Sequence, residues 1–281
     1  MNKNFIRIIP KLDIKNGNLI KGINLEGLRI LGDPYNFANY YAAHGADEIT
    51  YQDNVAALYG TNNLDKHISK TAIKLRIPLT VGGGIRSIKD IERVLSAGAD
   101  KVCLNSAIIQ NNNFLKNAIK NFGSSTISIV IETVRVDNKE FISYLNGREL
   151  INKKPIDWAK KIEDLGAGEL ILTSVNNEGL REGFDIKLIK QISKSVKIPV
   201  VAHGGAGNFN QVLNVIKKTN ISGVMIASLF HYHYLNFVES KILKNIGNIE
   251  FLKNFKKRKV KKNLIKELKE YLKRNKVNVR L

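Results

Sequence analysis

The chain is predicted to form one (β/α)8 TIM barrel of the α/β class, and two observations predict this fold. Eight short apolar, β-branched runs alternate with helical patterns, which is typical of a parallel sheet closed into a barrel. An internal repeat also indicates that the barrel is built from two half-barrels of four strands each. The predicted domain covers residues 1–281, with a basic insertion at 235–262 before the last helix.

The strand candidates are nearly uninterrupted apolar runs, as expected of strands that are covered on both faces. They lie at 7–14, 47–52, 77–83, 100–105, 126–133, 168–174, 198–205 and 223–228. Helical patterns separate them, for example at 36–45, 87–98, 155–166 and 209–218. Residues 136–153 predict a hairpin after the fifth strand, and 261–275 predict the last helix.

The repeat is visible as pairs of motifs that lie 121 residues apart. GADEI at 45–49 recurs as GAGEL at 166–170, and Ile77-Pro78 recurs as Ile198-Pro199. Gly83-Gly84 recurs in the same way as Gly204-Gly205. A barrel of two four-stranded halves explains a shared offset, whereas a doubly wound sheet gives no reason for one.

Composition excludes several classes of protein. The formal net charge is +20, and the excess of positive charge concentrates late in the chain, at 251–262. Because no nucleic-acid reader motif is present, we interpret this charge as a biased composition with a solvated insertion, and no nucleic-acid partner is predicted. No apolar run approaches the ~20 residues that span a bilayer, so no membrane partner is predicted. The lone Cys103 excludes an internal disulfide, and a cytoplasmic location is expected. The spacing of His231 and His233 is poor evidence for a metal, and none is predicted.

Two glycine turns lead from strand ends into helices, at VGGGIRS (81–87) and HGGAGN (203–208). Glycines let the backbone approach a phosphate, and a helix N-terminus supplies N–H donors. One such turn could serve only a tight connection, but two turns related by the repeat favour a ligand with a phosphate at each end. The predicted phosphate-binding residues at the strand ends are Gly84, Asn105, Ser106, Gly204, Gly205, Ala227 and Ser228.

Two carboxylates end opposed strands. Asp13 ends the first strand and Glu132 the fifth, and such a pair can act as general acid and general base if the two pKa values are split. The alternative is that each caps a loop or pairs with Lys21 or Arg135. His203 could transfer protons or, as we prefer, form a neutral wall beside a phosphate. Further substrate-binding candidates are Lys21, Asp53, Glu178 and Gly179.

Nearly the whole chain resembles the HisF-type cyclase subunit of imidazole glycerol phosphate synthase. The resemblance rests on RIIPKLDIKNGNLIKG, GDP, LTVGGGIRS, GADKVCLNSA, DWAKKIEDLGAGELILTS, HGGAG, ASLFH and LKEYLKRNKVNVRL. It implies a lyase of histidine biosynthesis that needs no cofactor. This lyase converts phosphoribulosyl formimino aminoimidazole carboxamide ribotide plus ammonia to imidazole glycerol phosphate and aminoimidazole carboxamide ribotide.

The resemblance also implies residue roles and shows departures. Asp13 matches a catalytic aspartate, whereas Glu132 and Glu178 stand where the family has aspartates. His203 replaces a serine, and Lys11 stands where the family usually has a small residue. The departures and the insertion keep a second interpretation open. In it, the chain is a HisF-like paralogue that channels ammonia for sugar amidination in surface polysaccharide (lipopolysaccharide O-antigen) synthesis.

A ring of charged residues at the barrel floor matches the family's ammonia gate. Its members are Arg7, Glu48, Lys101 and Glu169, and Asp100 beside them matches a partner contact. The alternative is that the ring only stabilises the floor. The resemblance implies a HisH-type glutaminase that docks at the N-terminal face as a heterodimer and delivers ammonia through the barrel.

Overall fold

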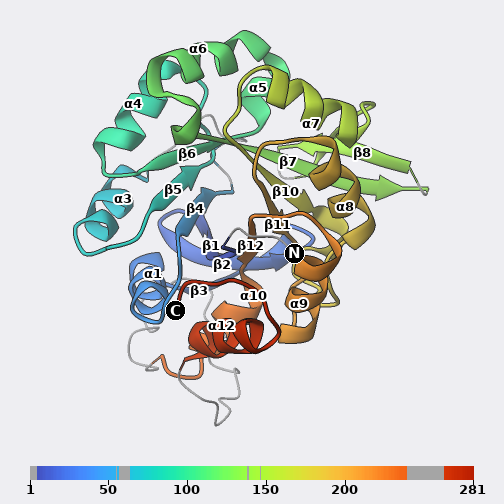
Figure 1. Ribbon diagram of the computed structural model, residues 1–281. Coiled ribbons are helices and arrows are strands. Elements are labelled where there is room, and N and C mark those ends of the chain that lie inside the picture. Colours follow the sequence, from blue (N-terminus) through green and yellow to red (C-terminus); the bar gives the residue numbers. More distant parts are fainter. Residues whose placement is uncertain (1–4, 55, 57–63, 138, 146, 239–262) are drawn as a thin grey trace.

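The computed structural model describes residues 5–54, 56, 64–137, 139–145, 147–238 and 263–281. Parallel strands close a barrel in the order β10-β11-β12-β1-β4-β5-β6-β7, and β7 pairs with β10 to complete it (Figure 1). All eight predicted strands are confirmed. Their bounds are Arg7–Lys15 (β1), Ile49–Asp53 (β4), Leu79–Gly82 (β5), Lys101–Leu104 (β6), Ile127–Val136 (β7), Glu169–Ser174 (β10), Val200–His203 (β11) and Gly223–Ile226 (β12).

The alternation of side chains along β1 explains how the barrel is filled. Ile8, Leu12 and Ile14 belong to the large outer core that the helices cover. Ile9 belongs instead to a small cluster with Cys103, Ile171, Val201 and Met225, which come from four other barrel strands. Successive side chains of a strand point to opposite faces, so Arg7, Lys11 and Asp13 share the inward face of Ile9.

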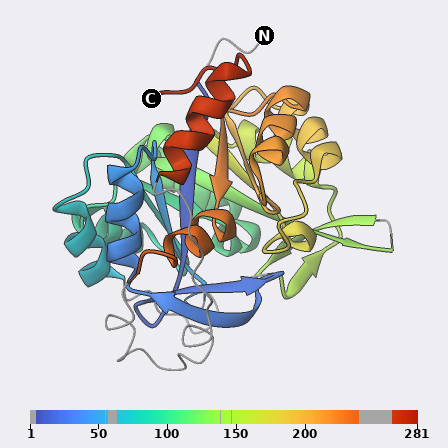
Figure 2. The ribbon, with the colours of Figure 1, turned by 90° about the horizontal axis from the view of Figure 1, so that it is seen from below.

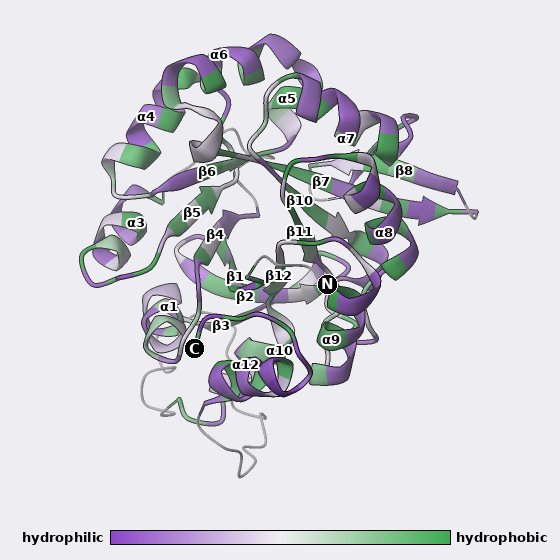
Figure 3. Cartoon of the chain, in the orientation of Figure 1, coloured by the Kyte–Doolittle hydropathy of each residue, from purple (hydrophilic) through white to green (hydrophobic). Residues whose placement is uncertain are grey.

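Helices surround the barrel, and their green apolar stripes alternate with purple polar surface in Figure 3. The predicted helices are confirmed, including the last one. The larger helices are Pro34–Ala43 (α1), Asp65–Ala72 (α3), Ile88–Ser96 (α4), Asn112–Phe122 (α6), Pro155–Asp164 (α7), Ile186–Ser195 (α8), Phe209–Lys218 (α9) and Leu264–Arg274 (α12). Two short helices, Ser106–Gln110 (α5) and Ser228–Tyr234 (α10), follow β6 and β12.

The half-barrel repeat is present in the folded chain. β5 and β11 have the same length and begin 121 residues apart, as do α1 and α7. The helix caps repeat as well. Ser87 caps α4 and Asn208 caps α9, each in a capping box with the side chain three residues later, Asp90 or Gln211.

Two antiparallel hairpins extend the barrel at the carboxyl ends of its strands, and Figure 2 shows β2 and β3 crossing the end opposite the chain termini. The predicted hairpin after the fifth strand is confirmed as β8 (Lys139–Tyr144) and β9 (Glu149–Ile151). The hairpin of β2 (Asn18–Ile23) and β3 (Glu26–Gly32) was not expected, because no strand was predicted between the first strand and the helical pattern at 36–45. Asn16 and Gly17 both have positive φ, which suits a tight turn from β1 into β2.

The last helix is held to the barrel by a buried ion pair. Lys269 Nζ lies 2.7 Å from Asp47 Oδ1, and Asp47 also accepts a hydrogen bond from the N–H of Ile8. Most of the predicted insertion, residues 239–262, lies outside the described residues. The single-domain assignment therefore stays a prediction. Within the described ranges no helix is both long and apolar enough to cross a membrane.

Candidate active site

Asp13 is held between two lysines at the carboxyl end of the barrel. It is 1% exposed, contacts Lys11 Nζ directly, and lies 3.8 Å from Lys21 Nζ. Burial alone would raise the pKa of Asp13, but the two lysines outweigh burial and lower it to about 2. Asp13 is therefore ionised at neutral pH. The alternative that Asp13 pairs with Lys21 is correct in part, with Lys11 as the nearer partner.

Glu132 lies on β7, which is four strands from β1 in either direction around the barrel. Its side chain is buried, and Oε2 has no hydrogen-bond partner among the described residues. Burial raises the pKa of Glu132 to about 7, although Lys11, the backbone of Gly147 and the side chain of Asn105 oppose this. The alternative of a Glu132–Arg135 pair is wrong, because Arg135 binds carboxylates elsewhere.

Lys21 and Glu178 connect the β2–β3 hairpin to the loop after β10. Lys21 is 1% exposed and contacts Glu178 Oε1 directly. The N–H of Asn24 donates to the backbone oxygen of Glu178 at 2.8 Å, and the N–H of Leu25 donates to its side chain at 3.4 Å. The hairpin turn is thereby fastened over the site.

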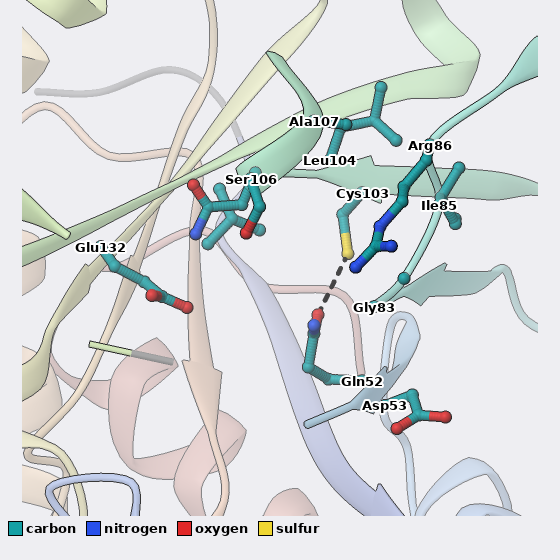
Figure 4. A pocket seen from close by; sticks show the side chains of 13 residues that line it. Gln52, Asp53, Gly83, Ile85, Arg86, Cys103, Leu104, Ser106, Ala107 and Glu132 are labelled. Atoms are coloured by element: carbon teal, nitrogen blue, oxygen red, sulfur yellow. Dashed lines mark hydrogen bonds between the residues drawn. The ribbon is translucent and has the colours of Figure 1, made fainter. Parts of the chain in front are cut away.

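The first glycine turn lines a cavity together with the predicted groups of the neighbouring strands. Gly84 has φ +68°, and an added Cβ would lie 2.6 Å from Ala56 Cβ. Figure 4 shows Glu132 directed into the space beside Gln52 and Cys103. The cavity is lined by Gln52, Asp53, Gly83, Gly84, Arg86, Cys103, Asn105, Ser106 and Glu132, among others. Asp53 also accepts a hydrogen bond from the N–H of Ala56 at 2.9 Å, so it orders the turn that follows β4.

The second glycine turn lines a separate cavity on the same rim. Gly205 has φ +106°, and an added Cβ would lie 1.9 Å from the oxygen of Gly183. His203 is buried, and its Nδ1 lies 3.1 Å from Thr173 Oγ1. Burial and the nearby lysines hold the pKa of His203 well below the usual range, so the imidazole is neutral. The lining includes Glu178, Gly179, Arg181, His203, Gly204, Gly205, Ala227 and Ser228.

Four charged residues meet at the opposite end of the barrel, where strands begin. Arg7 donates to Glu48 at 3.0 Å and contacts Glu169 directly. Lys101 Nζ lies 3.4 Å from Glu48, and Thr80 donates to the same carboxylate at 2.6 Å. The predicted ring is thus one connected set of ion pairs across β1, β6 and β10, with Glu48 immediately before β4.

Comparisons with known proteins identify a family and several relatives. A family model described as "Histidine biosynthesis protein" matches residues 7–236. An imidazole glycerol phosphate synthase subunit HisF from Legionella pneumophila is 47% identical over 207 residues, which are 73% of this chain and 98% of the relative. Subunits HisF from Bacillus cereus (strain G9842) and Lactococcus lactis are 43% and 42% identical, over 80% and 85% of this chain and 90% and 94% of theirs.

The chain belongs to the HisF family. It is therefore a cyclase subunit of imidazole glycerol phosphate synthase, a lyase of histidine biosynthesis. Against the HisF pattern, Glu178 and Glu132 are each one methylene longer than the expected aspartates. The longer Glu178 still reaches Lys21, and the longer Glu132 still ends inside the barrel mouth.

Most residues of the HisF rim were predicted from the sequence, but four were missed: three that line the two glycine-turn cavities, and Lys11 beside Asp13. Lys11 was noted only as a departure, yet it is the nearest cation to Asp13. Arg86 follows the first glycine turn, and Arg181 follows Gly179 by two positions, so each stood next to a predicted motif. Gln52 was hidden inside an apolar strand pattern, where only the inward period of two could reveal it.

Proposed function

We propose that the chain binds its ribotide with one phosphate at each glycine turn and cyclises it with Asp13 and Glu132. The observation that supports this most is the opposite pKa shift of two carboxyls on facing strands, one to about 2 and one to about 7. Two acids in different protonation states between two anion sites suit a reaction that both removes and delivers protons.

The proposed steps follow from the proton movements. Ammonia adds to the substrate carbonyl, and the oxygen needs a proton to leave as water. Ring closure onto the formimino carbon removes a proton from nitrogen, and the departing aminoimidazole needs one. Asp13, ionised at neutral pH, is suited to accept protons, and Glu132, with a pKa of about 7, can deliver one.

The experiment supplies purified protein with the ribotide and a high concentration of ammonium, and follows imidazole product by absorbance. Turnover that is lost in Asp13→Asn and in Glu132→Gln supports the proposal. Glu140→Gln is the control, because Glu140 pairs with Arg135 on the hairpin. Full turnover in either variant, or tight ribotide binding without turnover in the unaltered protein, would contradict the proposal.

We also propose that a HisH-type glutaminase docks at the floor and that ammonia enters through the ring of Arg7, Glu48, Lys101 and Glu169. The relatives are named as subunits, which implies a partner for the synthase. Arg7→Met should lower glutamine-driven turnover while leaving ammonium-driven turnover intact. Arg274→Met, at an exposed ion pair on α12, is the control. An equal loss in both assays would contradict the route. A cytoplasmic location stays a prediction.

A further inference from the structure

Lys11 is a buried lysine inside the barrel to which the proposed chemistry gives no role of its own. It lies two residues before Asp13 on β1, so both side chains point inward. Its side chain lines a cavity below the rim together with Thr50, Cys103 and Glu132. The cation therefore sits in the barrel interior, in contact with one proposed catalytic acid and in the same cavity as the other.

We propose that Lys11 is a positioning residue that fixes the carboxylate of Asp13 and supplies a permanent positive charge to both proposed acids. This inference rests on the proposed function. We assign Lys11 no contact with the substrate, because the ammonium group of Lys11 contacts Asp13 directly and Lys11 lines neither glycine-turn cavity.

Burial makes this pairing obligatory. A buried ammonium without an anion would be strongly destabilising, so Lys11 needs a carboxylate partner. Burial alone would lower the pKa of Lys11, but Asp13, Glu178 and Glu132 together raise it, so Lys11 stays charged. The other titratable groups that its charge reaches are Cys103, His203 and His231, and Lys21 is the second cation facing Asp13.

The two lysines at Asp13 hold it from different parts of the fold. Lys21 belongs to β2 of the hairpin. Its Nζ lies 3.8 Å from Asp13 Oδ2 and makes a closer contact with Glu178. Lys11 belongs to the barrel wall itself. Any displacement of the hairpin would carry Lys21 away, whereas Lys11 would keep Asp13 ionised and oriented. The barrel-wall lysine is therefore the constant partner.

Removing the positive charge of Lys11 should shift the pH dependence of kcat/KM in one direction. Lys11 lowers the pKa of Asp13 and of Glu132, so its loss should raise both. The alkaline limb of ammonium-driven kcat/KM, which reports Glu132, should move to higher pH by on the order of one unit in Lys11→Met. We expect kcat to fall about 10²-fold, because Asp13 loses its fixed orientation, while KM stays nearly unchanged.

Matched variants distinguish this role from packing. Thr50→Val changes the same cavity without changing charge and should leave the alkaline limb in place. Lys11→Arg restores the cation and should return the limb to its original pH. Lys11→Gln removes the charge but keeps a donor for Asp13, and it replaces Lys11→Met if that variant does not fold. An unmoved limb in a folded, charge-free variant overturns the inference, whereas absent turnover in the unaltered protein overturns the proposed function instead.

Discussion

Replacing Glu132 with glutamine should change how stability depends on pH, in a direction that burial dictates. The pKa of Glu132 is raised from 4.5 to about 7. Between these values the unfolded chain ionises Glu132 while the folded chain keeps its proton, so the unfolding free energy of the unaltered protein falls as pH rises. One pKa unit corresponds to about 1.4 kcal/mol, so the full contribution is about 3 kcal/mol. Glutamine cannot titrate and avoids this loss.

Urea unfolding at about pH 5 and about pH 8 measures the effect. The stability of Glu132→Gln relative to the unaltered protein should rise by about 3 kcal/mol between the two conditions, since all other titrating groups are shared. Asp90→Asn, at the start of α4, is the control. The pKa of Asp90 is lowered from 3.8 by hydrogen bonds from Arg86 and Ser87, so it titrates below both conditions, and its relative stability should not change between them. Parallel curves for Glu132→Gln and the unaltered protein would refute the argument that Glu132 is buried as a neutral acid.

Three further predictions concern the rim and the floor. Asp13→Asn should lower ammonium-driven turnover by about 10²- to 10⁴-fold with ribotide affinity retained, and a retained rate would exclude Asp13 as the base. Gly205→Ala should weaken ribotide binding measured by calorimetry, because its Cβ would lie 1.9 Å from the oxygen of Gly183 at φ +106°; an unchanged Kd would argue against a phosphate there. Lys269→Met leaves Asp47 buried without its cation and should cost about 3–5 kcal/mol, seen by scanning calorimetry as a melting temperature lower by roughly 6–10 °C. Adding Asp47→Asn should restore part of that loss.

The sequence predicted the barrel because its signals are local and repeated. Each parallel strand is an apolar run between helical patterns, and the 121-residue offset that relates Gly84 to Gly205 also relates the caps Ser87 and Asn208. Asp13 and Glu132 were expected on the same rim, because the carboxyl ends of all barrel strands lie at one end of the barrel. These inferences needed only strand order and direction.

Contacts that depend on side-chain reach were not predictable in the same way. The hairpin of β2 and β3, which carries Lys21, was not predicted, although the Asn16-Gly17 turn signal was present. The pairing of Lys11 with Asp13 needed the period of two along β1, together with the knowledge that this face is enclosed. Arg135 was paired with the wrong carboxylate, because its partners are Glu140 on β8 and Asp185 at the N-cap of α8, which only the folded chain brings to it.

The inward face of β1 has a consequence for how this barrel can vary. Alternate residues of this one strand supply the floor cation Arg7, the apolar lining Ile9, the interior lysine Lys11 and the rim acid Asp13. A slip of one residue against the neighbouring strands would turn all four outward at once. Insertions and deletions can therefore accumulate in the outer loops, while this nine-residue segment admits exchange of side chains but no change of length.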